Sequence, residues 1–315
     1  MSEPFPAECL YVTGATAVGK TAVGIELAKL VGGEIIAMDS MTVYRGLDIG
    51  TAKPTAEERA AVPHHLLDIV EPHAEFSQAE YASAARAAID DVLSRGKLPI
   101  LVGGTPLYLK TLLRGMFEGP PADWDLRKRL DEQAAQEQPG WLQKKLAAVD
   151  PAAAEKLHAN DARRLIRALE VHELTGVPIS EHQKHFEHAR TEAKGRVFVI
   201  DWPRERMMMR INARVDAMIA AGLVDEVRRL QEAEQGLGRT ARQALGYREV
   251  LEHLADRISH KQMVEAAKTH TRQFAKRQLT WFRSLGECTF VSIFGDFDPR
   301  KTAQKIYSGL WQRMR

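Results

Sequence analysis

The chain has 315 residues, of which 44% are hydrophobic and 27% charged, and its net charge is +2. This composition is typical of a soluble globular protein with one large domain or two smaller ones, and the near-neutral charge means that a nucleic-acid surface requires local basic clusters. The two cysteines, Cys9 and Cys288, exclude a disulfide framework. No secretory signal and no apolar stretch of the ~18 residues that a membrane span needs is evident, so we expect a cytoplasmic protein.

A phosphate-binding motif lies near the N-terminus. Residues 10–13 predict a β-strand, and an apolar-periodic helix is predicted to begin at Lys20. Between them, Gly14 to Thr21 match the P-loop spacing G-x-x-x-x-G-K-[ST]. Backbone N–H groups and the helix N-terminus favour an anion there, and a turn that binds nothing has no use for Lys-Thr at the helix start. We therefore expect a polyphosphate or diphosphate on Lys20 and Mg²⁺ on the Thr21 hydroxyl.

Strands and helices alternate in the first third of the chain. Residues 34–38 and 98–102 predict buried strands, and residues 65–70 form a third apolar run. Residues 77–94 predict an amphipathic helix, whereas residues 41–63 show little periodicity and predict a loop. This alternation predicts an α/β fold, with a doubly wound parallel P-loop sheet and helices on both faces.

The pattern changes in the middle of the chain. Residues 122–190 are helical in character and divided by prolines, and a strand pattern returns at 196–202. We therefore predict a P-loop catalytic core formed by residues 1–119 and 196–315, interrupted by an α-helical insertion at 120–195.

Two long helices are predicted after the insertion, at 204–232 and 261–285. The second is basic: residues 268–283 contain five Lys or Arg and no Asp or Glu, with Phe274 and Trp281 between them. Basic groups beside aromatic rings are typical of RNA surfaces, but the same pattern fits a solvated helix whose apolar side packs on the core. The pattern alone leaves both interpretations open.

One candidate catalytic acid follows a predicted strand, whereas a later strand lacks an acid at the corresponding position. Asp39 lies where α/β sheets bind ligands, so it could be a general base or an outer-shell partner of a metal, but Asp-Ser also caps turns. The later strand runs into Gly103-Gly104-Thr105 and lacks the acid that holds Mg²⁺ in motor ATPases and GTPases. Arg214 could bind a leaving phosphate or pair with a surface acid such as Asp216.

Several longer motifs resemble the tRNA dimethylallyltransferases, also called tRNA isopentenyltransferases. They run in order along almost the whole chain: Gly14 to Thr21, Asp39 to Pro54, Gly103 to Tyr108, Asp161 to Glu170, Gly246 to Glu249 and Lys276 to Trp281. The resemblance implies transfer of a dimethylallyl group from dimethylallyl diphosphate to the N6 amine of the adenine beside the anticodon, with release of diphosphate. It also implies Mg²⁺ as cofactor and the tRNA anticodon stem-loop as partner. We expect a monomer, because the tRNA covers much of the basic surface.

The resemblance also implies roles for individual residues. Asp39 accepts the proton of the adenine amine, Thr105 positions that amine, and Lys20 and Arg214 contact the diphosphate. The implied diphosphate-binding residues are Gly14, Ala15, Thr16, Ala17, Val18, Gly19, Lys20 and Thr21. The implied tRNA-binding residues are Asp39, Ser40, Met41, Thr42, Thr105, Arg127, Arg163, Arg164, Leu165, Ile166, Arg167, Gln243, Gly246, Tyr247, Arg248, Lys276, Arg277, Gln278, Trp281 and Arg283.

Two positions depart from the family pattern. Many members have Pro where this chain has Ala15, and many have Gln where Thr42 stands, so the side chain at position 42 has a shorter reach toward the neighbouring nucleotides.

Three other functions share parts of the pattern. A small-molecule P-loop kinase would use the same loop for ATP, but the missing acid argues against it. An isopentenyltransferase acting on free AMP has no use for the basic stretches at 163–167 and 276–283. A nucleotide-gated RNA-binding protein would not need Asp39 near Thr105.

Overall fold

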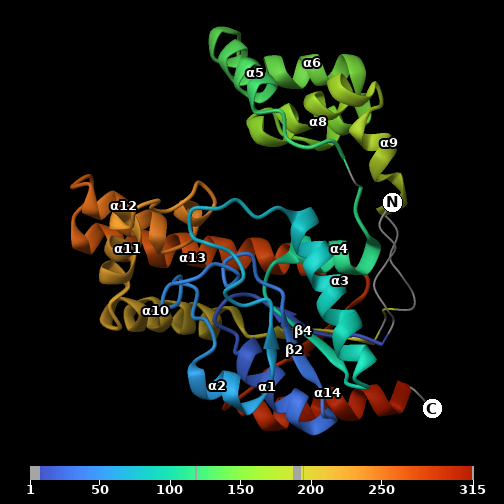
Figure 1. The fold of residues 1–315 in the computed structure, drawn as a ribbon, viewed down its shortest axis with the longest axis vertical. Helices are drawn as coiled ribbons and strands as arrows, with labels where there is room; N and C mark the ends of the chain where they lie inside the picture. Colours follow the sequence, from blue (N-terminus) through green and yellow to red (C-terminus); the bar gives the residue numbers. More distant parts are fainter. Residues whose placement is uncertain (1–7, 118, 187–192, 194, 314–315) are drawn as a thin grey trace. The chain divides into compact units, whose positions relative to one another are not determined.

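The computed structural model describes residues 8–117, 119–186, 193 and 195–313. The chain divides into two compact units, one spanning Arg114–His188 and the other formed by Phe5–Leu113 and Ala189–Arg315 (Figure 1). The sequence placed the boundaries of the helical segment at 120 and 195 instead, so the division in the structure begins and ends earlier in the chain.

A six-stranded parallel sheet forms the centre of the larger unit, with the strand order β3-β2-β4-β1-β5-β6. Every pairing between neighbouring strands is parallel. The strands are β1 (Leu10–Gly14), β2 (Glu34–Ala37), β3 (His64–His65), β4 (Pro99–Val102), β5 (Val197–Asp201) and β6 (Cys288–Ser292). This sheet confirms the predicted α/β P-loop fold.

The central strands of this sheet carry apolar side chains on both faces, and helices bury both of these faces. Leu10 and Val12 of β1 belong to one apolar cluster, and Tyr11 belongs to another on the opposite face. The first cluster is covered by α1 (Lys20–Val31), α10 (Arg204–Ala220) and α14 (Pro299–Arg313), and the second by α3 (Gln78–Ser94) and α4 (Pro106–Arg114). Helices α1 and α14 lie side by side in Figure 1.

A third apolar cluster lies in the larger unit outside the sheet. It joins the loop residues Val43, Tyr44 and Leu47 to α11 (Leu223–Glu232) and α12 (Tyr247–Leu254). Helix α13 (His260–Arg283) packs against α10 and α12 and also contributes Leu279 to the sheet cluster. This cluster brings the segment after β2 close to helices from the second half of the chain.

The smaller unit is helical and has its own apolar core. Its elements are α5 (Trp124–Gln136), α6 (Trp141–Val149), α7 (Pro151–Lys156), α8 (Ala162–Thr175), α9 (Ile179–Gln183) and the 3-10 turn η1 (Lys184–Phe186). Its core is formed mainly by leucines of α5, α6 and α8. Among the described residues of both units, no helix is long and apolar enough to cross a membrane.

Three predicted elements differ from the structure, and one strand was not predicted. The loop expected at 41–63 contains α2 (Ala56–Ala61), which has no buried residue and therefore no apolar period, and which begins at a capping box between Thr55 and Glu58. The helix expected at 204–232 breaks at Gly222, whose φ of +97° ends α10 and begins α11. The run at 65–70 gives only the two-residue strand β3, and β6 was not predicted.

Candidate functional site

The P-loop connects β1 to α1, and side chains from outside the loop stabilise its backbone. Arg210 donates a 2.9 Å hydrogen bond from Nε to the carbonyl of Ala17, and the indole of Trp202 donates one of 3.1 Å to that of Val18. Ala17 has a φ of +64°, a left-handed conformation that costs ~1–2 kcal/mol for an L-residue. The contact from Arg210 therefore helps to offset the cost of this backbone geometry.

Gly19 ends the loop at the first turn of α1. Its φ is +92°, and a Cβ there would lie 2.4 Å from the ring of Phe297. Arg210 stacks on the same ring and on Trp202, with 5.2 Å and 4.6 Å between the guanidinium carbon and the two ring centroids. The segment that follows β6 thus packs directly against the phosphate-binding loop.

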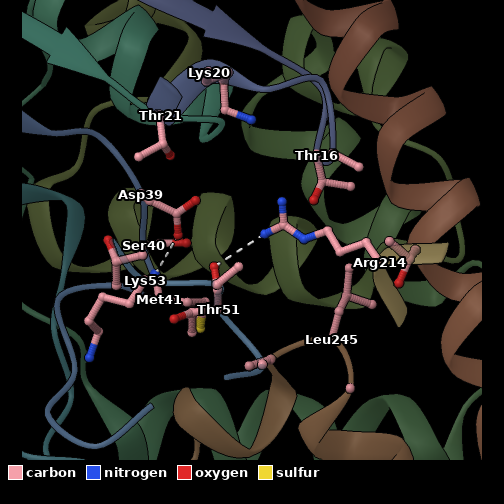
Figure 2. A pocket seen from close by; sticks show the side chains of 18 of the residues that line it. Thr16, Lys20, Thr21, Asp39, Ser40, Met41, Thr51, Lys53, Arg214 and Leu245 are labelled. Atoms are coloured by element: carbon pink, nitrogen blue, oxygen red, sulfur yellow. Dashed lines mark hydrogen bonds between the residues drawn. The ribbon is translucent and has the colours of Figure 1, made fainter. Parts of the chain in front are cut away.

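A cavity of about 860 Å³ opens beside this loop within the larger unit. A volume of this size is ample for a small diphosphate together with part of a second substrate. Figure 2 shows Asp39 and Arg214 projecting into the space below Lys20 and Thr21 from opposite sides. The predicted site residues that line the cavity are Thr16, Ala17, Gly19, Lys20, Thr21, Asp39, Ser40, Met41, Thr42, Thr105, Arg214, Gln243, Gly246, Arg248, Arg277 and Gln278. Gly14, Ala15 and Val18 are buried behind the lining.

Asp39 and Thr105 lie on adjacent loops that follow neighbouring strands. One carboxylate oxygen of Asp39 accepts a 2.9 Å hydrogen bond from the backbone N–H of Met41, so the residue does cap a turn. The hydroxyl of Thr105 accepts a 3.1 Å hydrogen bond from the N–H of Ser40. The turn bond occupies only one carboxylate oxygen, so it does not prevent Asp39 from acting on a group in the cavity.

The two loops approach this closely because of Gly103. A Cβ on that residue would lie 1.9 Å from the carbonyl oxygen of Met38, at the end of the neighbouring strand. Gly103 also accepts, through its carbonyl, a 2.7 Å hydrogen bond from the buried hydroxyl of Thr13. Any side chain at position 103 would therefore separate Asp39 from Thr105.

The cavity is strongly cationic beside the P-loop. Burial and the nearby Arg214 lower the pKa of Lys20 to about 8, against the opposing effect of Asp39. Burial also lowers the pKa of Arg214, with Asp39 opposing and Arg210 contributing in the same direction as burial. Since cationic groups crowded at one point favour an anion between them, this end of the cavity is suited to a diphosphate.

Arg214 is directed into the cavity. Its guanidinium donates a 3.4 Å hydrogen bond to the carbonyl of Thr51 (Figure 2). The surface acid Asp216 forms an ion pair with Lys268, with 2.8 Å between the charged atoms. The alternative that Arg214 serves as a surface ion-pair partner of Asp216 is therefore wrong.

Helix α13 supplies one wall of the cavity. His270, Thr271, Phe274, Arg277 and Gln278 all line it. The first three were not among the predicted site residues, although their spacing with Gln278 of three and four residues marks one helix face. This spacing is the signal in the sequence that indicates the cavity-facing side of the helix.

A buried carboxylate positions two residues at the rim of the cavity. Glu249 accepts hydrogen bonds from Arg248, with Nη2–Oε1 of 2.7 Å, and from His270, with Nδ1–Oε1 of 2.7 Å. Burial alone would raise the pKa of Glu249, but the bonds from His270 and Arg248 outweigh it and hold its pKa below the usual range. Glu249 was not predicted as a site residue.

Several residues predicted to bind tRNA lie elsewhere. Lys276, Trp281 and Arg283 are exposed on α13 and do not line the cavity. Tyr247 is completely buried, with its hydroxyl bonded to Glu226. Its side chain is a packing element, so the surface role indicated by the sequence does not apply to it.

The residues of the smaller unit that were predicted to bind tRNA also include both buried and exposed side chains. Leu165 and Ile166 belong to its apolar core, so their side chains are not available to a ligand. Arg127 and Arg167 both bind the buried carboxylate of Glu170, with Arg127 forming two bonds of 2.8 Å. The remaining two predicted residues, Arg163 and Arg164, are exposed.

The donors available for a metal ion are few. Thr21 and Asp39 line the same cavity, and residues 8–117, 119–186 and 195–313 contain no group of three or more His, Cys, Asp or Glu that could hold a metal. Mg²⁺ commonly binds through one or two protein oxygens together with substrate phosphates and water. The Thr21 hydroxyl and the Asp39 carboxylate fit that mode of binding.

Comparison with known proteins agrees with this geometry. The IPP transferase family model matches residues 42–285. A tRNA dimethylallyltransferase 1 from Trichlorobacter lovleyi is 49% identical over 275 residues, covering 87% of this chain and 90% of the relative. The tRNA isopentenylpyrophosphate transferase of Bacillus halodurans is 37% identical with a TM-score of 0.70, covering 98% of both chains. A eukaryotic dimethylallyltransferase acting on tRNA is 30% identical with a TM-score of 0.74, covering 90% of this chain and 73% of the other.

Proposed function

Because the chain belongs to the IPP transferase family, we propose that it transfers a dimethylallyl group from dimethylallyl diphosphate to the N6 amine of the adenine beside the anticodon in tRNA. One observation carries the proposal: a single cavity is lined by the P-loop lysine Lys20, by Arg214, and by the pair Asp39 and Thr105. The cationic end suits a departing diphosphate, and the carboxylate suits an amine that loses a proton.

The leaving group is stabilised at the cationic end of the cavity. Allylic carbon–oxygen cleavage leaves the electron pair on the diphosphate, so positive charge nearby lowers the barrier. Lys20 and Arg214 supply that charge, and the N–H groups at the start of α1 add to it. The Thr21 hydroxyl would hold Mg²⁺, which would contribute further charge neutralisation when bound.

The acceptor is activated at the other side of the cavity. The adenine N6 forms a bond to C1 of the dimethylallyl group as the C1–O bond to diphosphate breaks, and one N6 proton passes to Asp39. The hydroxyl of Thr105 accepts a hydrogen bond from the N–H of Ser40, the residue after Asp39, and this proximity supports a role for Thr105 in orienting the amine. The base is the nucleophile, so the reaction requires no Ser or Cys nucleophile.

The tRNA is bound by the basic surface of α13 and by the helical unit. Lys276 and Arg283 are exposed, and Trp281 is 37% exposed, so charge for phosphates lies beside a ring for stacking. The target adenine must leave the anticodon-loop stack to reach Asp39, as in other enzymes that modify a base. We propose that the enzyme acts as a monomer.

An anticodon stem-loop RNA with [¹⁴C]dimethylallyl diphosphate tests this function. The label should enter RNA that carries adenine beside the anticodon, with release of one diphosphate for each group transferred. The same stem-loop with guanine at that position is the matched control and should remain unlabelled. Labelling of free AMP at a comparable rate would instead favour an isopentenyltransferase acting on the nucleotide.

A further inference from the structure

Gln278 is a buried amide on α13 that contacts two loops of the cavity. Its side chain is 3% exposed, and its Oε1 accepts a 2.9 Å hydrogen bond from the backbone N–H of Thr16. Its Nε2 donates to the carbonyl of Gly104. The orientation of the amide is unambiguous, because the P-loop partner can only donate and the other can only accept.

These two bonds connect the two sides of the reaction. Thr16 belongs to the P-loop, whereas Gly104 immediately precedes Thr105. The hydroxyl of Thr105 accepts from the N–H of Ser40, the residue that follows Asp39. Hydrogen bonds through Gln278 therefore connect the P-loop to the Gly104–Thr105 turn, and the bond from Ser40 connects that turn to the loop that carries Asp39.

The close packing at Gly104 also indicates that Gln278 lies between the P-loop and the turn before Thr105. A Cβ on Gly104 would lie 2.8 Å from Nε2 of Gln278 and 3.3 Å from Nζ of Lys20. The amide of Gln278, the lysine of the P-loop and the turn before Thr105 thus meet with no room for a methyl group.

We propose that Gln278 is a positioning residue, which holds the P-loop and the Gly104–Thr105 turn at the separation that the transfer requires. This inference rests on the proposed function. It replaces the contact with tRNA that the sequence indicated for Gln278, whose neighbours Lys276 and Arg277 are exposed while its own side chain is not. The helix that presents basic residues to solvent therefore also aligns the two reacting groups.

Gln278→Met tests the proposal, because methionine has a similar length and makes neither hydrogen bond. We expect the single-turnover rate with bound donor and stem-loop RNA to fall roughly ten- to hundredfold, as for a displacement of about 1 Å at the reacting groups. The Kd for the stem-loop should stay within about twofold, because no tRNA contact is lost. Gln231→Met is the matched control: Gln231 is an exposed glutamine of α11 outside the cavity lining, and this variant should keep the wild-type rate.

Gln278→Glu tests the two hydrogen bonds separately. The glutamate side chain has the same size as glutamine and keeps an oxygen that accepts from the N–H of Thr16. It loses the donor to Gly104 and places a carboxylate near the diphosphate site, so we expect weaker binding of inorganic diphosphate as well as a slower transfer.

Two results would overturn the proposal. A loss of stem-loop affinity equal to the loss in kcat/KM, with the single-turnover rate unchanged, would make Gln278 a tRNA contact. Wild-type rates in both Gln278 variants would remove any role. If the wild-type protein itself transfers nothing to RNA, it is the proposed function that fails, and diphosphate binding by the two variants still reports on the coupling to the P-loop.

Discussion

The ammonium group of Lys20 donates a 2.7 Å hydrogen bond to the backbone carbonyl of Ala15, inside the loop that precedes it. The same group has a pKa of about 8, lowered by burial and then by Arg214. Below that pH Lys20 is protonated and binds an anion; above it the charge is lost. The P-loop lysine therefore titrates in a range that an activity measurement can reach.

The first prediction concerns this titration. We expect kcat/KM for dimethylallyl diphosphate, measured at saturating RNA, to fall about tenfold per pH unit above about pH 8, because the free enzyme loses the Lys20 charge. In Lys20→Arg the guanidinium stays protonated, so the overall rate is lower but this alkaline limb disappears. If kcat/KM falls in the same way above about pH 8 in the wild type and in Lys20→Arg, a group other than Lys20 is responsible for the pH dependence.

The second prediction concerns Asp39. Asp39→Asn keeps an oxygen that can accept from the N–H of Met41, so the turn is retained while the base is removed. We expect kcat to fall by roughly 10²–10⁴, the contribution of a positioned general base, with stem-loop affinity within a few-fold. Asp39→Ala also removes the hydrogen bond from Met41, so the difference between the two variants measures the contribution of that bond to the rate. Loss of RNA binding together with activity in the Asn variant would contradict a catalytic role.

The third prediction concerns Glu226, which stabilises the loop after Asp39. This carboxylate is 2% exposed and accepts hydrogen bonds from the N–H groups of Asp48, Ile49 and Gly50, at 3.1, 2.8 and 3.3 Å. In Glu226→Gln an N–H₂ group replaces one acceptor and faces these donors. Urea unfolding should show a loss of about 1–3 kcal/mol, the cost of leaving buried polar groups unpaired.

Glu232 provides the control for this variant. It lies on the same helix and is exposed, so Glu232→Gln should leave the free energy of unfolding unchanged. Equal unfolding free energies for the Glu226 variant and the wild type would show that the bonds to the loop contribute nothing to stability.

The fourth prediction concerns the exposed basic residues of α13. Lys276→Ala should weaken binding to stem-loop RNA and reduce the slope of log K against log salt by about one unit or less, as for loss of one phosphate contact. Lys301→Ala on α14 is the comparison, because Lys301 is also exposed but lies on the helix packed against α1. Identical salt slopes for both variants and the wild type would place the RNA elsewhere.

Local patterns in the sequence were enough to predict the P-loop and most of the sheet. The glycine spacing and Lys20-Thr21 specify the loop without any distant partner, and continuous apolar runs mark strands buried on both faces. Asp39 could be proposed because it directly follows such a strand, whereas the role of Thr105 was implied only by the family resemblance. The helix α2 gave no comparable signal, since it has no apolar period, and the apolar run at 65–70 was a misleading one, since β3 comprises only His64–His65.

The supporting contacts could not be predicted because their partners are far apart in the sequence. Gln278 binds Thr16 across 262 positions, and Trp202 binds Val18 across 184. No local pattern records such a pair. Leu165 and Tyr247 were assigned to the tRNA because the resemblance implied whole stretches of the chain, and only the packed helices show that these two side chains are internal.

The most direct test of the account is nucleoside mass spectrometry after incubation of the purified protein with unmodified tRNA, Mg²⁺ and either dimethylallyl diphosphate or ATP. We predict an adenosine heavier by one dimethylallyl group, formed only with the isoprenoid donor and lost in Asp39→Asn. Absence of this adduct, together with hydrolysis of ATP or phosphate transfer from it, would contradict the account, since the cavity beside Lys20 would then bind a nucleotide for phosphoryl chemistry.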